Sequence, residues 1–365
     1  MNTILQPTTT AELQEIVTAS PRLCVRGGGS KPGLSTPAAG ATAVDLRRLS
    51  GILEYVPDEF VFTAYAGTPV SQVAEELARH GQYLPFDPLL VGRGATLGGT
   101  VAANTCGSGR YRYGGVRDFI LGVRFVDGRG QLVRSGGKVV KNAAGFDLAK
   151  FLVGSLGRYG ILVEVSFKVF PRPRSYLTLE FTYPSLAEVQ RAIFRLAVEP
   201  LDIDALDFEP AGKTEFRLIA RLGGLEAGLP DRTGRLEEFL QGEGRPLPQQ
   251  TLLGDGEAAY WREVNQLAWV PSEASLLKVP LAPRVVPVLD ARLRSAVRRY
   301  TAGGSVAWLA VDDLRAARNV LTDLGLTGLR IWGPGGDPFV GSRRGMLLAQ
   351  RAKRALDPSA RFGEA

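Results

Sequence analysis

The sequence is poor in the side chains that most often bind transition metals. Its 365 residues include two cysteines, Cys24 and Cys106, and one histidine, His80. It has no Cys-x-x-Cys pair, so we expect neither an iron–sulfur cluster held by this chain alone nor a Cys/His zinc site. Both cysteines lie among apolar or glycine residues, which favours packing over reactivity. We therefore predict that the chain holds no metal.

Long apolar runs are also missing. No stretch of about eighteen apolar residues is present, so no transmembrane helix is expected. The first residues, MNTILQPTTTAELQEIV, lack the basic and apolar regions of a secretory signal. We predict a cytoplasmic protein, and peripheral contact with the inner face of the membrane stays open.

The charge balance lacks an acidic excess. The chain has 44 Lys and Arg against 37 Asp and Glu, a net charge of +7. The basic residues are scattered among apolar ones, as on solvated helix faces; the arginines of residues 291–300 are an example. We therefore expect no nucleic-acid partner. An acidic partner protein, an anionic membrane surface or an anionic cofactor would match this charge.

The length suits two or three domains. The proline-rich residues 171–175 predict a boundary, so we expect a first domain over residues 1–173. Residues 174–337 then alternate strands and helices in a pattern that repeats, which is typical of an α+β sandwich, with a helix on a sheet in each repeat. The last part, residues 338–365, contains a basic amphipathic helix.

Local signals predict several elements of the first domain. Thr9 and Glu12 form a capping box for a helix over residues 10–19. A second helix is expected after Thr68 as the cap, with Pro69 in its first position and Gly81 beyond its end. A hairpin is expected around DGRG. Residues 85–115 show little periodicity and are rich in glycine, which indicates a long functional loop.

The stretch VRGGGSKPG, residues 25–33, places three glycines after a predicted strand. It does not match a Walker A loop, and Pro32 stands where a dinucleotide fingerprint needs its last glycine. Successive glycines can nevertheless aim several backbone N–H groups at one anion, with Arg26 and Lys31 adding charge. Taken alone, the stretch favours a generic tight turn over an anion site.

Two further clusters of small residues follow, over residues 95–115 and 138–162. Small residues let a flat ligand approach the backbone, and Asn104, Thr105 and Ser108 offer hydrogen bonds. Three such clusters in one half of the chain suggest one large ligand with a phosphate end and a planar end.

The motifs RGGGSKPG, GATLGGTVAAN, VRDFILG, KNAAGFDL and KVFPRP occur in that order. With them the chain resembles the FAD-binding domain of the vanillyl-alcohol oxidase / p-cresol methylhydroxylase (PCMH) superfamily. Within that superfamily it is most similar to the FAD-binding subunits of bacterial glycolate oxidases. The resemblance implies an α+β fold: a PCMH-type domain of two α+β subdomains, a smaller α+β cap, and a C-terminal helix that packs back on the FAD domain.

The resemblance also implies the residues that hold FAD. The pyrophosphate would lie on the first loop, the ribityl chain and flavin along the second cluster, and the strand after residue 160 would flank the flavin or adenine. The residues expected to bind FAD are Arg26, Gly27, Gly28, Gly29, Ser30, Lys31, Pro32, Gly33, Pro85, Asp87, Pro88, Thr96, Leu97, Gly98, Gly99, Ala102, Ala103, Asn104, Gly107, Ser108, Gly109, Ile161 and Val163.

Histidine is absent where the superfamily often uses it. The first loop has no histidine to attach flavin, and His80 lies at a helix C-terminus, a usual structural place for this residue. We therefore expect FAD to be non-covalent. Related dehydrogenases carry a histidine motif in the second domain, but residues 174–365 contain no histidine. Lys141 and Asn142 remain as catalytic candidates; the alternative is a structural ion pair between Lys141 and Asp147.

The resemblance thus predicts an FAD-binding subunit of a glycolate oxidase-like complex. Such a subunit would relay electrons beside a flavoprotein partner and an iron–sulfur partner. Two alternatives stay open: a stand-alone FAD-dependent dehydrogenase of another hydroxy acid or alcohol, and a flavin-free scaffold.

Overall fold

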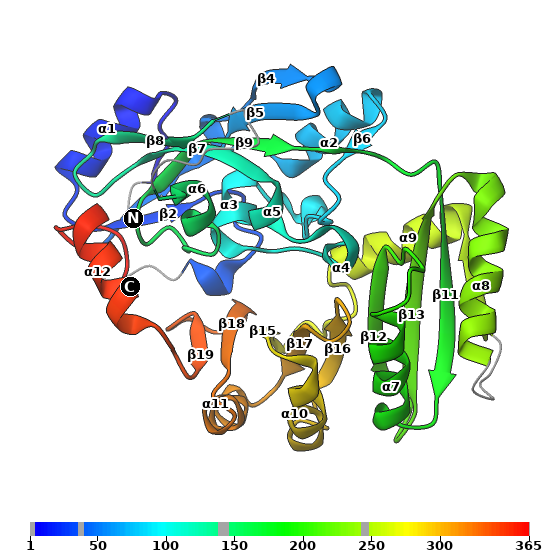
Figure 1. The fold of residues 1–365 in the computed structure, drawn as a ribbon. Helices are drawn as coiled ribbons and strands as arrows, with labels where there is room; N and C mark the ends of the chain where they lie inside the picture. The colour runs from blue at the N-terminus through cyan, green and yellow to red at the C-terminus, as the bar shows by residue number, and fades with distance from the viewer. Residues whose placement is uncertain (1–3, 36–39, 138–145, 242–247, 365) are drawn as a thin grey trace. The chain divides into compact units, whose positions relative to one another are not determined.

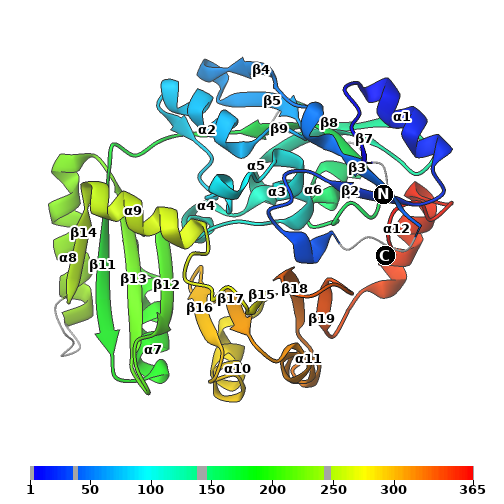
Figure 2. The same ribbon diagram turned by 180° about the vertical axis from the view of Figure 1, so that it is seen from behind.

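A computed structural model describes residues 4–35, 40–137, 146–241 and 248–364. The described chain forms two compact units, coloured along the chain in Figures 1 and 2. Unit 1 comprises Met1–Cys106, Gly114–Arg172 and Arg344–Ala365, and unit 2 comprises Gly107–Tyr113 and Pro173–Arg343. None of the helices in these ranges is long and apolar enough to cross a membrane.

Unit 1 is built on two main sheets. One is parallel, in the order β1-β3-β2, and the other is antiparallel, in the order β4-β5-β9-β7-β8. The strands of unit 1 are β1 (Ile4–Leu5), β2 (Leu23–Arg26), β3 (Thr42–Asp45), β4 (Ile52–Val56), β5 (Val61–Tyr65), β6 (Gln82–Tyr83), β7 (Ile120–Val126), β8 (Leu132–Gly136), β9 (Ile161–Lys168) and β10 (Phe170–Pro171). Its helices are α1 (Thr10–Ala19), α2 (Val70–Arg79), α3 (Leu97–Ala103), α5 (Val116–Phe119), α6 (Leu148–Leu152) and α12 (Met346–Leu356).

The predicted start of α1 is confirmed, whereas that of α2 is wrong by one residue. Thr9 caps α1 by accepting a hydrogen bond from the Glu12 N–H. In α2 the N-cap is Pro69, and the Thr68 hydroxyl instead bonds the backbone of Gly51. Thr68 is fully buried, so its hydroxyl ties two segments of the fold together rather than capping the helix.

Residues 85–115 are more regular than their composition predicts. They contain α3 and the single-turn α4 (Arg110–Tyr113), and α5 begins directly after them. The helical spacing was hidden because α3 consists largely of glycine, alanine and threonine, which give no amphipathic pattern. The hairpin around DGRG is confirmed as β7 and β8.

Unit 2 is a nine-stranded sheet in the order β14-β11-β13-β12-β16-β17-β15-β18-β19. The strands are β11 (Ser175–Tyr183), β12 (Ala205–Pro210), β13 (Phe216–Gly224), β14 (Gln250–Leu253), β15 (Ser275–Pro280), β16 (Val297–Thr301), β17 (Val306–Val311), β18 (Thr327–Trp332) and β19 (Phe339–Gly341). The helices between them are α7 (Leu186–Leu196), α8 (Leu229–Gln241), α9 (Gly254–Asn265), α10 (Val286–Arg292) and α11 (Leu314–Asp323).

The sheet of unit 2 repeats one topology. Along the chain, each half runs strand-helix-strand-strand-helix-strand. In both halves the strands lie side by side in the order fourth, first, third, second. The halves meet where β12 pairs with β16. Helices α7, α8, α10 and α11 share the apolar core on one face, whereas α9 packs on the other face through Trp261 and Val264 (Figure 2).

The sequence suggested that the arginines of residues 291–300 lie on a solvated helix face, but not all of them do. Helix α10 ends at Arg292, and strand β16 carries Arg298 and Arg299. Arg299 is buried and pairs with Asp207 and Glu209, while Arg298 pairs with Asp290. These arginines neutralise buried carboxylates, so they do not contribute to a free basic surface.

The C-terminal helix α12 belongs to unit 1. The buried Lys353 ammonium donates hydrogen bonds to the Asp357 carboxylate and to the carbonyls of Arg158 and Phe362. Phe362 packs in the core of unit 1 with Leu13 and Val17 of α1. The backbone also joins here, because Leu23 of β2 donates to the Arg361 carbonyl at 2.7 Å.

Candidate functional site: a glycine-lined anion pocket

A pocket in unit 1 begins where β2 ends. Strand β2 delivers the chain to Arg26, and the loop Gly27–Lys31 follows at the carboxyl edge of the parallel sheet. The cavity has a volume of about 110 Å³. Gly29 has a φ of +68°, a conformation that side chains disfavour.

The first two glycines of the loop are required by close approach. A Cβ on Gly28 would lie 1.6 Å from the Gly94 carbonyl oxygen, and one on Gly27 would lie 2.2 Å from Oγ1 of Thr96. No side chain fits there unless the backbone moves. The glycines therefore let the loop lie flat against the 94–99 segment, with its backbone exposed to the pocket.

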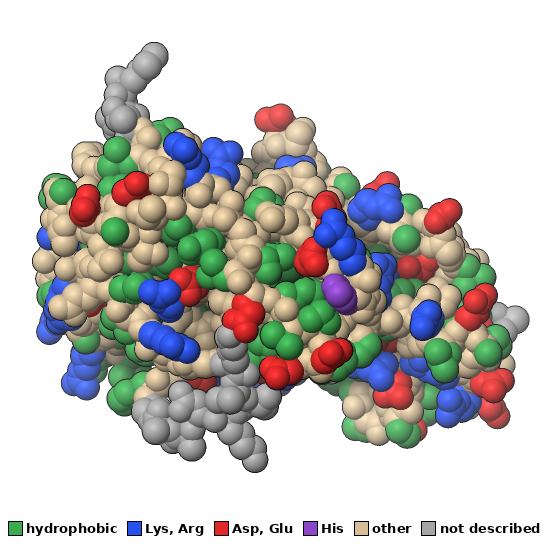
Figure 3. Space-filling model, turned by 90° about the horizontal axis from the view of Figure 1, so that it is seen from above, with side chains coloured by type: hydrophobic (Ala, Val, Ile, Leu, Met, Phe, Trp, Pro, Cys, Tyr) green, Lys and Arg blue, Asp and Glu red, His purple; other side chains and the backbone are tan. Residues whose placement is uncertain are grey.

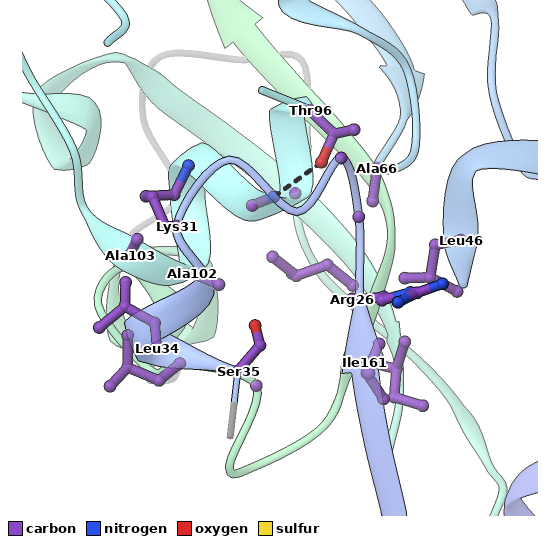
Figure 4. A pocket seen from close by; sticks show the side chains of 18 of the residues that line it. Arg26, Lys31, Leu34, Ser35, Leu46, Ala66, Thr96, Ala102, Ala103 and Ile161 are labelled. Atoms are coloured by element: carbon purple, nitrogen blue, oxygen red, sulfur yellow. Dashed lines mark hydrogen bonds between the residues drawn. The ribbon is translucent and has the colours of Figure 1, made fainter. Parts of the chain in front are cut away.

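Helix α3 supplies the opposite wall. Thr96 caps it by accepting from the Gly99 N–H at 3.3 Å, drawn as the dashed line in Figure 4. Gly98 packs against Ala66, where a Cβ would come within 2.7 Å of the Ala66 methyl group. The chain after α6 closes this wall, since Leu156 donates to the Ala102 carbonyl.

The remaining walls are apolar. Leu34, Ala102 and Ala103 lie on one side of the pocket, and Leu46 and Ile161 lie on the other (Figure 4). The hydroxyl of Ser35 lies between them. The pocket thus joins a polar glycine end to an apolar end, as a ligand with an anionic and a planar part requires.

The charges around the pocket favour an anion. Among the described residues that line it, the charged side chains are Arg26 and Lys31, and no carboxylate is present. Lys31 is 8% exposed, and its ammonium lies 3.1 Å from the Ser30 hydroxyl. Two positive side chains beside exposed glycine backbone favour an anion at this end of the pocket.

Asp45 holds Arg26 from behind the pocket. Its carboxylate is fully buried at the end of β3, 3.5 Å from the Arg26 guanidinium and 2.7 Å from that of Arg47. Burial by itself would raise the pKa of Asp45, but the hydrogen bonds from Arg47 and the charge of Arg26 outweigh it and hold that pKa below its usual value. Asp45 therefore stays ionised at neutral pH.

The structure brings together many of the residues expected to bind FAD. Those that line the pocket are Arg26, Gly27, Gly28, Gly29, Ser30, Lys31, Thr96, Gly98, Gly99, Ala102, Ala103 and Ile161. They come from three separate segments of the chain: the loop after β2, α3 with its cap, and the start of β9.

Other expected residues lie outside the lining. Pro32 and Gly33 form a 3₁₀ turn behind the loop, Leu97 is buried in α3, Asn104 caps its C-terminus, and Val163 is buried in the core. Pro85, Asp87 and Pro88 lie in a separate part of unit 1, where Pro88 forms a bridge with Cys106.

Gly107, Ser108 and Gly109 belong to unit 2. The Ser108 hydroxyl donates to the buried Asp207 carboxylate at 2.5 Å. Burial raises the pKa of Asp207, while Arg299 and Ser108 act in the opposite direction. The segment is thus attached to β12, which the glycine pattern did not indicate.

The pocket also contains residues that the sequence did not single out for it: Val25, Leu34, Ser35, Leu46, Ala66, Leu156, Gly157, Gly160 and Leu162. A signal for Leu46 existed, because it follows β3, and parallel neighbouring strands end at the same edge of a sheet. Ser35 and Leu34 simply follow the glycine loop. Ala66 carries no sequence signal.

The catalytic candidates Lys141 and Asn142 lie outside the described residues. Asp147, the alternative ion-pair partner of Lys141, caps α6 and pairs with Lys150 at 3.2 Å. His80, the purple side chain in Figure 3, is 43% exposed at the end of α2 and packs edge-on against Tyr55. It is not among the residues that line the pocket.

The glycine-lined pocket, which we call the cradle, fits the pyrophosphate and one apolar moiety of a dinucleotide such as FAD. The loop glycines present backbone that a Cβ would fill, two cations flank it, and apolar walls continue it. Together with the paired sheets of unit 1, this site defines a flavoprotein of the PCMH type, in which the cofactor is FAD.

Comparisons with known proteins agree with this class. Residues 2–136 match the FAD binding domain family. The chain is 35% identical over 317 residues to glycolate oxidase subunit GlcE of Escherichia coli (strain K12), an alignment that covers 84% of this chain and 83% of GlcE. The chain belongs to the FAD-dependent oxidoreductase family of glycolate oxidase FAD-binding subunits.

More distant relatives match a little over half of the chain. Glycolate oxidase subunit GlcD of Bacillus subtilis (strain 168) is 28% identical over 56% of this chain and 45% of GlcD. A D-lactate dehydrogenase of Anaerostipes hadrus is 28% identical over 56% of this chain and 44% of that protein. The chain spans less than half of each, so these matches say nothing of their remaining domains.

A solved structure shows the same fold over nearly the whole chain. Alkyldihydroxyacetonephosphate synthase superposes with a TM-score of 0.73 at 15% identity, covering 98% of this chain and 76% of the synthase.

Proposed function

We propose that this subunit uses its FAD to relay electrons within a glycolate oxidase-like complex, while a flavoprotein partner oxidises the 2-hydroxy acid. An iron–sulfur partner would accept the electrons. The relatives named as glycolate oxidase subunits support a multi-subunit assembly.

One contrast carries the proposal: the anion cradle is complete, but no histidine follows residue 80. Hydroxy-acid oxidation needs a group that takes the hydroxyl proton near neutral pH, and histidine suits this best. Unit 2 contains buried ionisable groups, but Asp207 is ion-paired with Arg299, which also contacts Glu209.

The chain's own residues would hold the cofactor rather than the substrate. FAD, when bound, supplies hydride and electron transfer. The backbone of Gly27–Gly29 and the charges of Arg26 and Lys31 would hold its pyrophosphate. Leu46, Ile161 and Leu34 would shield its apolar part from water. No histidine lines the cradle, so we expect the flavin to dissociate on acid precipitation and to remain in the supernatant.

Anaerobic bleaching at about 450 nm tests the relay, since flavin loses this absorbance when it is reduced. The purified, FAD-loaded chain should keep its colour with glycolate or D-lactate and lose it with dithionite. Addition of a small molar fraction of the GlcD-type subunit from the same organism should then allow glycolate to bleach it.

Direct bleaching by glycolate or D-lactate, at the rate of ordinary enzyme turnover, would overturn the proposal. Bleaching by another hydroxy acid or an alcohol would instead favour a stand-alone dehydrogenase. A colourless chain that cannot be reconstituted with FAD would make it a scaffold.

A further inference from the structure

The outer face of α12 carries two neighbouring apolar side chains that are open to solvent. Leu347 is 62% exposed and Leu348 is 71% exposed. Arg344, Arg351 and Arg354 are exposed around them. Residues three and four apart share one side of a helix, so Leu347, Leu348, Arg351 and Arg354 form one surface. Arg344 lies just before the first turn of α12, and we call these five side chains the α12 patch.

The inner face of α12 is fixed to unit 1 without help from the patch. Lys353 is 8% exposed and is held by Asp357 and by the carbonyls of Arg158 and Phe362. Asp357 in turn accepts from the backbone N–H groups of Arg361 and Phe362. The patch is therefore presented on a preorganised helix, which lowers the entropic cost of binding.

The charge of the patch is of one sign. In the described part of the chain, no carboxylate forms an ion pair with Arg344, Arg351 or Arg354. Exposed leucine surrounded by arginine matches the composition of protein interfaces, which have an apolar centre and are enriched in arginine. The complementary surface would carry carboxylates around an apolar recess.

Charge and apolar area argue against two other occupants of the α12 patch, a second copy of the chain and a membrane. A second copy would bring the same arginines face to face in a two-fold interface, which like-charge repulsion opposes. A membrane would gain only two leucine side chains, and even a myristoyl chain gives marginal membrane binding. A carboxylate-bearing protein surface suits both the leucines and the arginines.

We propose that the α12 patch docks on a carboxylate-bearing surface of the GlcD-type flavoprotein subunit. This inference rests on the proposed function, because it takes its partner from the proposed complex. It adds the surface that joins the two subunits and the chemistry of its counterpart.

Titration of the full-length chain against the purified GlcD-type subunit of the same organism tests the inference. A Leu347→Ser/Leu348→Ser variant should weaken the Kd by about 10- to 100-fold, as loss of central interface anchors does. Arg351→Glu should also weaken binding and should reduce its dependence on NaCl. The matched controls are Val198→Ser, which is 81% exposed in unit 2, and the exposed Arg294→Glu; both should bind as wild type does.

Flavin content and melting temperature should stay at wild-type values in every variant, which separates lost docking from lost folding. If wild type binds and the double serine variant binds equally well, the α12 inference is wrong and the proposed complex stands. If wild type does not bind the GlcD-type subunit at all, both are wrong.

Two further measurements identify a different occupant. Flotation with phosphatidylethanolamine–phosphatidylglycerol vesicles that the double variant abolishes would replace the protein partner with a membrane. A wild-type dimer in sedimentation that the double variant dissociates would replace it with a second copy.

Discussion

At Gly28 an added methyl group would clash with the backbone of a neighbouring segment. Gly28→Ala would bring Cβ within 1.6 Å of the Gly94 carbonyl oxygen, and backbone cannot rotate away as a side chain can. Since overpacking typically costs 1–3 kcal/mol, we expect FAD affinity to fall about tenfold or more. The absorbance ratio of flavin to protein after gel filtration measures this. Gly137→Ala is the control, because a Cβ there meets nothing within 4 Å.

Asp45 makes the stability of the folded chain depend on pH in one direction. Its pKa is lowered in the folded chain, so its stabilising effect is present above its unfolded pKa of about 3.9 and disappears as pH falls through the folded value. Asp45→Asn should lower the melting temperature at pH 7. The difference from wild type should begin to shrink below about pH 4 and should vanish once the pH is below the lowered pKa of Asp45, where both side chains are neutral. A constant difference across pH would contradict the role of the charge.

Helix α3 contains a hydrogen-bonded threonine and an unpartnered one. Thr96→Val removes the N-cap and should destabilise the protein by about 0.5–2 kcal/mol. Thr100 is 1% exposed, and its hydroxyl has no partner among the described residues. Thr100→Val should be neutral or stabilising, because it removes a buried polar group that lacks a hydrogen bond. Urea unfolding measures both changes. Thr96→Val should lower the free energy of unfolding, and Thr100→Val should leave it unchanged or raise it.

The attachment of α12 depends on Lys353. Burial lowers the pKa of its ammonium, while Asp357 partly restores it. Lys353→Met would leave the Asp357 carboxylate buried without its cation, which typically costs about 3–5 kcal/mol. The exposed Lys213→Met is the matched control. Equal unfolding midpoints for the two variants would show that α12 does not stabilise unit 1.

The two units should respond differently to the cofactor. Every residue of the pocket lies in unit 1, and each unit has its own apolar core. FAD at about 100 times its Kd adds about 2.7 kcal/mol, enough to raise a melting transition by roughly 5–10 °C. Calorimetry with and without FAD should therefore move the transition of unit 1 alone. Equal shifts in all transitions would mean that unit 2 also holds the cofactor.

The sequence predicts most of what depends on local chemistry. The glycine loop, the caps of α1, the hairpin and the helix of the tail all follow from spacing and residue type. Helix α3 was missed because small residues give no amphipathic signal. The arginines of β16 were read as helical because the ion-pair partners of Arg299, Asp207 and Glu209, are distant in sequence. Ala66 and Leu156 reach the pocket only through the tertiary fold.

The core of unit 1 contains residues from both ends of the sequence, which affects how it folds during synthesis. Its core includes Leu13 near the start and Phe362 near the end, and the whole of β11–β19 is made between them. The ribosome must therefore synthesise Pro173–Arg343 of unit 2 before the core beside the cradle can close. Flavin colour then reports that translation has passed residue 362, and a chain cut short within α12 should be made but remain pale.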